Sequence, residues 1–336
     1  MARKKGSRNR KVNVKKFRLK VLALSAGVIA LFGCVAGAIH HFGDEDTKDR
    51  VESVVAATID IVRESSLAPD ELVFLLDQVA DNLPFVHGVS VATGAEIVAG
   101  DYAVGGLPKS ETALSVLQNA GYVVGYDEAR GNPAWCAYKI FPPKSFDIAG
   151  RPSFSEDARS RRRPRVTSGD YTSSGYDRGH MAPNQSIGAC YGDAAQMETF
   201  LMTNVTPQLH SLNAGVWKNL EQRALRRYTR GFGDIWVICG PIYFSRDNGG
   251  SVKKIGKAGV EVPDAFFMIL ADVSEENGEV RTLAFIVPQK EKLDTDLKKY
   301  LVSIDEIEAE TGLDFFSDFS KEAQAQLESR AAKAVW

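Results

Sequence analysis

The sequence predicts an α+β fold, and two observations support this class. Runs rich in β-branched and aromatic residues lie between residues 122 and 287, and helical patterns stand beside them without strict alternation. Hydrophobic residues make up 44% of the 336 residues and charged residues 25%, so the chain can bury a large core. The composition excludes a chain disordered throughout and a protein with many membrane spans, and the length suits one large or two ordinary domains.

The first 20 residues form a basic tail. They contain ten Lys and Arg residues and no acid, which leaves 31 basic residues against all 43 acidic residues in the rest of the chain, a net charge of −12. The formal net charge of −2 therefore combines a basic tail with an acidic body. Any nucleic acid that the body binds must meet a local positive surface.

Residues 21–39 form an apolar run of nineteen residues without a charge. As a helix this run would be about 28 Å long, close to the thickness of the hydrocarbon core of a bilayer. Because the basic tail precedes it and acidic residues follow, the positive-inside rule predicts an uncleaved membrane anchor with the body outside the cytoplasm. The alternative is secretion after signal-peptide cleavage near Ala38, where Ala36-Gly37-Ala38 offers a site. A buried core helix would leave the charge asymmetry unexplained.

Residues 40–106 are predicted to form a mainly helical spacer. Val51, Val55 and Val62 recur at helical spacing, and Pro69 marks the start of a second helix over about residues 70–82. The glycine-dotted stretch 87–106 predicts irregular structure or short strands. The apolar stripes are packing surfaces, and we assign no chemistry to them.

From Tyr122 onward the pattern changes to strands. Residues 122–141 predict a hairpin with its turn at 128–133. Further predicted strands cover residues 235–238, 265–272 and 283–287. Predicted helices cover residues 193–201, 213–228 and 320–333.

Several kinds of site are excluded by spacing. The five histidines form neither HExxH nor a Cys/His ligand cluster, and the chain has no GxSxG elbow. The segment 250–257 fails as a phosphate loop because five residues, not four, separate its glycines. The cysteines Cys34, Cys136, Cys190 and Cys239 allow at most one disulfide within the body, and free thiols are equally compatible with them.

One segment, residues 176–221, concentrates the polar residues that can carry chemistry. Residues 177–180, Asp-Arg-Gly-His, place an imidazole beside a carboxylate, a guanidinium and a glycine that permits close approach. Asn213, Trp217 and Glu221 are spaced i, i+4, i+8, which predicts one flank of a helix. An amide oxygen and a carboxylate there, opposite the imidazole, suit a hydrated hard cation. His180 taken alone fits a structural role as well.

The segment resembles the DNA/RNA non-specific endonuclease family. Residues 177–180 match the Asp-Arg-Gly-His signature in full, and the resemblance continues through 181–184, 203–208 and the helix that begins at Asn213. It covers about residues 107–316, which we therefore predict to be a nuclease domain, with a C-terminal helix over 317–336.

The resemblance implies the ββα-metal fold with a mainly antiparallel central sheet, in which two strands and a helix hold one divalent ion, Mg²⁺ or alternatively Mn²⁺. It implies His180 as the general base that activates water and Asn213 as the direct metal ligand. Glu221 would position water molecules of the metal, unless it only forms an ion pair on the helix surface with an arginine of residues 223–227. Asn204 would fix its loop or those water molecules, unless it is a plain turn residue.

Arginines supply the local positive charge. Arg151 is our choice for the phosphate-binding arginine that the family carries upstream of the signature, and the arginines of residues 159–165 are either rivals or solvated loop charge. Arg178 is expected to bind phosphate or brace the site, because a guanidinium stays charged and does not transfer protons. A second basic group consists of Arg223, Arg226, Arg227 and Arg230.

The expected function is that of a metal-dependent endonuclease that hydrolyses DNA and RNA without sequence preference and leaves 5′-phosphate ends. The alternative is a catalytically idle surface module that binds nucleic acid or another polyanion. His180 and Asn213 together favour the enzyme. The membrane, through residues 21–39, is the other predicted partner, and the sequence identifies no protein partner.

Overall fold

The computed structural model describes residues 89–92, 100–244, 251–274 and 277–336. The chain divides into two compact units, Met1–Val86 and His87–Trp336. The first unit lies outside the described residues, and with it lie the predicted basic tail, the apolar run 21–39 and the spacer helices. Within the part of the chain that is described, no helix is long and apolar enough to cross a membrane.

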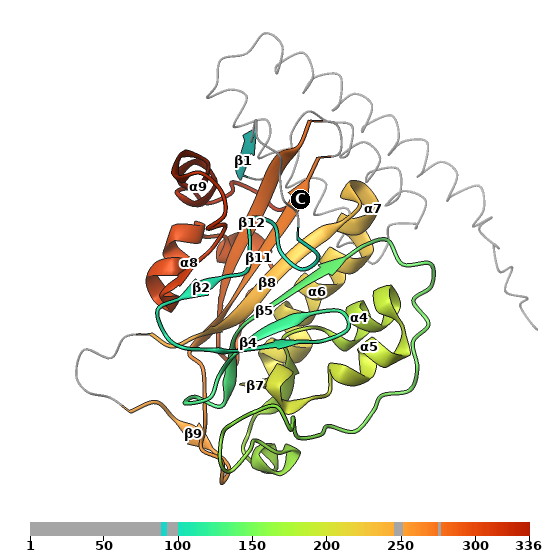
Figure 1. Ribbon diagram of the computed structural model, residues 1–336, viewed down its shortest axis with the longest axis vertical. Coiled ribbons are helices and arrows are strands. Elements are labelled where there is room, and N and C mark those ends of the chain that lie inside the picture. Colours follow the sequence, from blue (N-terminus) through green and yellow to red (C-terminus); the bar gives the residue numbers. More distant parts are fainter. Residues whose placement is uncertain (1–88, 93–99, 245–250, 275–276) are drawn as a thin grey trace, which may run out of the picture. The chain divides into compact units, whose positions relative to one another are not determined.

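A seven-stranded sheet forms the centre of the second unit (Figure 1). Its order is β1-β12-β11-β8-β5-β4-β3, and all neighbouring strands are antiparallel. The strands are β1 (Val89–Ala92), β3 (Ser115–Gln118), β4 (Val123–Asp127), β5 (Asn132–Ile140), β8 (Ile235–Ile242), β11 (Ala265–Val273) and β12 (Glu279–Pro288). The predicted α+β class, the antiparallel sheet, the hairpin and the three later strands are confirmed, whereas β3 was not predicted.

Helices cover both faces of this sheet (Figure 1). One face carries α4 (Asn184–Tyr191), α5 (Asp193–Glu198), α6 (Lys218–Arg223) and α7 (Thr229–Phe232), and the other carries α8 (Ile304–Thr311) and α9 (Lys321–Glu328). Side chains of β8 alternate between the two cores: Ile235 and Val237 pack on the first, Trp236 and Ile238 on the second. Because both faces are buried, the strand reads as a continuous apolar run.

The predicted helix 213–228 is part of a longer helical stretch, residues 212–232. It comprises η3 (Leu212–Trp217) and η4 (Ala224–Tyr228), both π-helical, with α6 and α7. Gly215 has non-helical angles, φ −104° and ψ −113°, which kink the first turns. The predicted helix is therefore confirmed in its range, but regular α-helical spacing does not apply between residues 212 and 217.

Two other helix predictions also need correction. The helical signal at 193–201 belongs to α5, which ends at Glu198, and α4 precedes it without having been predicted. The C-terminal helix is only α9, whose first turn is capped by the Ser320 hydroxyl oxygen accepting from the Ala323 N–H.

The chain beyond α9 ends in the core rather than in an appended helix. Trp336 packs edge-on against Tyr228 and Phe232, with ring centroids 5.4 and 5.2 Å apart. Residues 317–336 therefore belong to the same compact unit as the sheet, which comprises His87–Trp336.

Short paired strands and 3₁₀ turns complete the unit. The pairs are β2 (Lys109–Ser110) with β13 (Leu313–Asp314), β6 (Asp177–His180) with β7 (Val205–Gln208), and β9 (Lys254–Ile255) with β10 (Val260–Glu261). The 3₁₀ turns are η1 (Ser168–Tyr171), η2 (Met202–Asn204) and η5 (Leu297–Tyr300). Cys136, Cys190 and Cys239 are free thiols, so the body uses none of the disulfides that the sequence allowed.

We predict that Gly125→Ala destabilises the unit. Gly125 lies in β4 at an irregularity of the register with β5, and an added Cβ would stand 2.2 Å from the Trp135 ring. Overpacking of this kind lowers the free energy of unfolding by about 1–3 kcal/mol. Chemical denaturation measures the loss. The control is Gly150→Ala, whose Cβ would meet nothing within 4 Å; equal stability of the two variants would contradict the prediction.

Candidate active site

Strands β6 and β7 and the helical stretch 212–232 form a ββα unit. In the β6–β7 pair, His180 stands opposite Val205 and Gly179 opposite Thr206. A Cβ on Gly179 would lie 2.1 Å from Oε1 of the Gln208 side chain. Any residue larger than glycine at this position would therefore require the Gln208 side chain to move. The glycine of the signature thus leaves room for the Gln208 side chain of β7 beside β6.

A pocket of about 650 Å³ opens beside the ββα unit. Five of the six site residues that the sequence predicted line it: Arg151, Arg178, His180, Asn213 and Glu221. Tyr176, Asp177 and His210 line it as well. The fold therefore brings together a histidine, oxygen ligands and guanidinium groups that lie far apart in the sequence.

His180 is held between two aromatic rings. Its imidazole meets Phe200 edge-on at 4.9 Å and lies tilted against Phe154 at 5.3 Å. Burial, followed by the positive charge of Arg151, lowers the pKa of His180 to about 3. The imidazole is therefore neutral at pH 7 and able to accept a proton.

The Asp177 carboxylate joins β6 to the start of the helical stretch. Its Oδ2 accepts hydrogen bonds from Asn213 Nδ2 at 2.9 Å and from His210 Nδ1 at 2.8 Å. Because the amide nitrogen of Asn213 is engaged, its Oδ1 remains as the atom that can face a cation. No role of its own was predicted for Asp177, and His210 was not predicted as a site residue, although the i, i+3 spacing of His210 and Asn213 was a usable signal.

The turn that carries Asn213 is anchored to the residues that follow β12. The Leu209 N–H donates to Gln289 Oε1 at 2.8 Å, and the Ser211 hydroxyl donates to the Lys290 carbonyl at 3.0 Å. Gln289 Nε2 in turn donates to the Pro263 carbonyl at 2.7 Å. A side chain 76 positions beyond Asn213 thus helps to fix it, and no local pattern reports this.

Glu221 lines the pocket from α6. Burial raises the pKa of its carboxyl group to about 8, and Trp217 and Lys218 offset part of this rise. Trp217 itself does not line the pocket but packs in the core against Phe266, with ring centroids 5.6 Å apart. The predicted common flank of Asn213, Trp217 and Glu221 is therefore wrong in its middle member, since the π-helical turn and the Gly215 kink change the spacing.

The donor set in the pocket fits a hard divalent cation. The Asn213 amide oxygen and the carboxyl groups of Asp177 and Glu221 are all oxygen donors, which Mg²⁺ and Mn²⁺ prefer. The pKa of Glu221 stays raised in spite of the positive charge of Lys218, and a bound cation would offset the remaining cost of ionising this carboxyl group.

Two arginines frame the pocket through Phe154. The guanidinium of Arg151 lies 5.8 Å from the Phe154 ring centroid, and that of Arg178 lies 5.9 Å from it. Arg178 also donates a hydrogen bond to the Ser168 carbonyl at 2.6 Å. Of its two predicted roles, binding phosphate and bracing the site, this contact fits the second. Phe154 and Phe200 were missed, because no sequence spacing links them to His180.

Asn204 lies behind the pocket and does not line it. Its side chain is fully buried, with Nδ2 donating to the carbonyls of Ala182 and Thr199 at 3.0 and 2.9 Å. Its Oδ1 accepts from the Ala182 N–H at 2.8 Å. Of the two roles predicted for Asn204, fixing its loop or fixing water molecules of the metal, these contacts fit the first, since they clamp the segment that follows His180. Asn204 is therefore a positioning residue and is not grouped with the residues that line the pocket.

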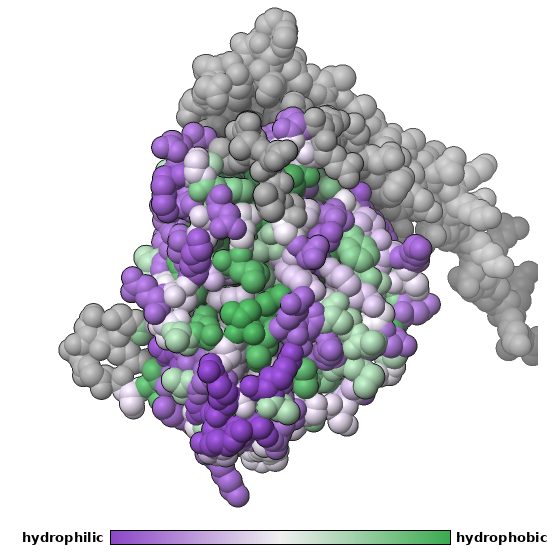
Figure 2. Space-filling model, in the orientation of Figure 1, coloured by the Kyte–Doolittle hydropathy of each residue, from purple (hydrophilic) through white to green (hydrophobic). Residues whose placement is uncertain are grey.

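Arginines of the run 159–165 form hydrogen bonds and ion pairs with loop residues. Arg159 pairs with Asp157 at 2.7 Å, and Arg162 donates to the carbonyls of Ala129 and Gly259. No member of the second basic group lines the pocket. Figure 2 shows a hydrophilic surface at the end of the unit where Figure 1 places β9. No arginine of the run lines the pocket, so the run supplies no rival to Arg151 there.

Residues 107–322 match the family described as DNA/RNA non-specific endonuclease. The mitochondrial nuclease EXOG of Danio rerio is 32% identical over 234 residues, which cover 66% of this chain and 66% of that protein. The chain thus spans slightly less than two thirds of that relative. The mitochondrial endonuclease G of Bos taurus is 32% identical over 244 residues, 70% of this chain and 78% of that protein.

A nuclease of Nostoc sp. is 30% identical over 220 residues, 62% of this chain and 76% of that protein. Among solved structures, the crystal structure of the EndoG/EndoGI complex aligns with a TM-score of 0.55 and 26% identity over 62% of this chain and 88% of that chain. The family match covers the whole ββα unit and the pocket beside it.

We predict that Glu221 makes stability depend on pH. Between pH 4.5 and 8 the folded protein keeps a proton on Glu221 that the unfolded chain releases, so this group lowers the free energy of unfolding as pH rises through that window. Glu221→Gln removes the effect. In EDTA, the stability of the variant relative to wild type should increase from pH 5 to pH 8, by at most about 1.4 kcal/mol per pH unit. Denaturation at both pH values checks this, with the exposed Glu291→Gln as control; a pH-independent difference for Glu221→Gln would contradict it.

Proposed function

The chain belongs to the DNA/RNA non-specific endonuclease family, whose members are hydrolases of phosphodiester bonds, and we propose that it cleaves both DNA and RNA internally, without sequence preference, to 5′-phosphate ends. The observation that supports this most is the convergence of His180, Asn213 and Glu221 on one pocket with Arg151 and Arg178 at its wall. An idle binding module would need the arginines but neither a neutral buried histidine nor an oriented amide.

The proposed reaction begins with His180. Its neutral imidazole takes a proton from a water molecule, whose oxygen forms a bond to phosphorus while the bond from phosphorus to O3′ breaks. The O3′ atom takes up a proton from solvent, and the phosphate stays on the 5′ side of the next nucleotide. The negative charge of the bound phosphate opposes the effect of Arg151 on the pKa of His180, so substrate makes the imidazole a stronger base.

Arg151 and Arg178 position the scissile phosphate. Arg151 is exposed and has no hydrogen bond to hold it elsewhere among the described residues, whereas Arg178 is tied to Ser168. We therefore assign phosphate binding to Arg151 first and give Arg178 the role of a fixed positive charge.

The proposed cofactor is Mg²⁺, with Mn²⁺ as a substitute. Asn213 Oδ1 would hold the ion directly and Glu221 would hold its water molecules, since Mg²⁺ keeps most of its hydration shell. When bound, the ion stabilises negative charge on the phosphate oxygens and the leaving oxygen.

We also propose that residues 21–39 anchor the protein in a membrane, with the nuclease unit on the extracytoplasmic side. The charge asymmetry around the apolar run supports this orientation. Export keeps a non-specific nuclease away from the genome of the cell that makes it. Cleavage near Ala38 and secretion is the alternative.

We predict that His180→Ala lowers the turnover of plasmid cleavage by about 10² or more, because general-base catalysis contributes roughly 10²–10⁴. Turnover is measured under saturating Mg²⁺ and plasmid, and circular dichroism establishes that the variant is folded. Glu310→Gln, an exposed change on α8, is the control and should keep wild-type turnover. A folded His180→Ala protein with near-normal turnover would rule out His180 as the base.

We predict that Asn213→Ala abolishes metal-dependent cleavage, whereas Glu221→Ala raises the Mg²⁺ concentration for half-maximal activity by about 10–100-fold. The measurement is a Mg²⁺ titration of plasmid nicking, with EDTA as the zero point. Equal cleavage by the wild type in EDTA and in Mg²⁺ would reject the metal assignment and leave the binding module as the better reading.

We predict that full-length protein is found in the membrane pellet of fractionated cells and is digested when protease is added outside intact spheroplasts. A soluble form that starts near Ile39 would support the cleaved signal instead. Protein with an intact N-terminus in the cytosol would contradict both.

A further inference from the structure

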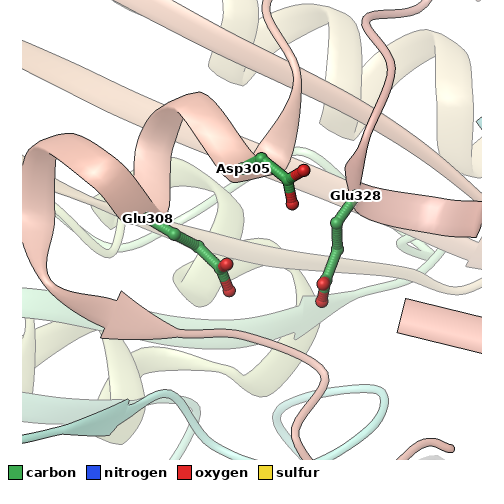
Figure 3. Close-up of side chains that lie close together, drawn as sticks. All are labelled: Asp305, Glu308 and Glu328. Carbon is green, nitrogen blue, oxygen red and sulfur yellow. The ribbon is translucent and has the colours of Figure 1, made fainter. Parts of the chain in front are cut away.

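A second group of oxygen ligands lies on the other face of the sheet, where α8 meets α9 (Figure 3). Asp305 and Glu308 are three positions apart on α8, and Glu328 is the last residue of α9. One oxygen of each carboxyl group lies within 4.8 Å of the other two. Among the described residues, no other group of three His, Cys, Asp or Glu side chains gathers as closely.

Glu328 is the residue that points to a ligand. Its side chain is only 5% exposed, and its Oε1 is buried without a hydrogen-bond partner. Figure 3 shows its carboxyl group turned into the space that Asp305 and Glu308 also face. A buried carboxylate oxygen normally accepts a hydrogen bond or meets a cation, so this oxygen lacks its partner.

Among the described residues, no Lys or Arg side chain is paired with these three carboxyl groups, and Lys321, which is nearby, donates to Gln324 Oε1 at 2.8 Å instead. Burial, and then the charges of Glu308 and Asp305, raise the pKa of Glu328 to about 8, so a proton is the occupant that competes with a cation.

We propose that Asp305, Glu308 and Glu328 form a Ca²⁺ site separate from the active site. Glu308 Oε1 accepts from the Phe315 N–H at 2.8 Å, which fixes that side chain and leaves its other oxygen available. Asp305 is exposed, so the site is open on one side to the ion and to the water molecules that complete its shell.

Coordination geometry favours Ca²⁺ over Mg²⁺. Ca²⁺ takes about 6–8 oxygen ligands at about 2.3–2.6 Å in a flexible arrangement, so it can accept three carboxyl oxygens that two helices hold within 4.8 Å of one another, together with water molecules. Mg²⁺ requires a near-ideal octahedron at about 2.0–2.1 Å and gives up its water molecules reluctantly, so a site in which three carboxyl groups replace water suits it less well. Bound Ca²⁺ ties α8 to α9, and with it the C-terminal segment to the sheet.

The test uses the full chain carrying Asn213→Ala, so that binding in the active-site pocket does not contribute. Isothermal titration with CaCl₂ should give one site per chain with a Kd of about 10⁻⁴–10⁻³ M. At a tenfold excess over that Kd, Ca²⁺ should raise the midpoint of thermal unfolding by about 3 °C. MgCl₂ at the same concentration should raise it by less than a third of that.

Three further substitutions assign the site. Glu328→Gln, a neutral change of the same shape, should abolish the Ca²⁺-dependent shift, and Asp305→Asn should weaken Ca²⁺ binding about tenfold. Glu310→Gln, an exposed carboxyl group on the same helix, is the matched control and should keep the full shift. Absence of the shift in the parent protein, its persistence in Glu328→Gln, or an equal shift with MgCl₂ would each overturn the proposal.

Discussion

The hydrogen bond from Asn213 Nδ2 to Asp177 Oδ2 is the interaction on which the site depends, because it joins β6 to the helical stretch 212–232. The two partners reach this contact from separately anchored positions. β6 is held by its pairing with β7 and by Asn204, and the turn before Asn213 is held by Gln289. Each anchor comes from a different part of the chain. The Asn213 amide is therefore oriented only when the whole ββα unit has folded.

Burial in the pocket acts in opposite directions on its two central groups. It lowers the pKa of His180 to about 3 and raises that of Glu221 to about 8, so both are uncharged at pH 7 in the absence of ligands. His180 reduces stability as pH falls from 6.5 toward 3, and Glu221 reduces it as pH rises from 4.5 toward 8. A phosphate beside Arg151 would lower the cost of protonating His180, and a cation beside Glu221 would lower the cost of ionising that carboxyl group. These are the two charged species that the proposed reaction brings into the pocket.

Patterns in the sequence predicted the elements and site residues that are determined by residues close to them along the chain. Strands β8, β11 and β12 followed from their apolar runs, and the Asp-Arg-Gly-His signature with the downstream asparagine identified the pocket residues. What could not be predicted depends on contacts between distant segments. Phe154 and Phe200 enclose His180. Arg159 and Arg162 form their contacts with loop residues instead of lining the pocket. Trp217 packs in the core, in a helical stretch that is kinked at Gly215. Membrane anchoring, predicted from residues 21–39, stays a prediction.

The Mg²⁺ dependence of plasmid cleavage by Asp177→Ala tests most directly whether an oriented Asn213 amide makes the site. Loss of the carboxylate frees the amide nitrogen, so the Mg²⁺ concentration for half-maximal activity should rise about 10–100-fold. His210→Ala, which removes only the other hydrogen bond to Asp177, should change it less than about threefold. An unchanged Mg²⁺ dependence in a folded Asp177→Ala protein would contradict the account.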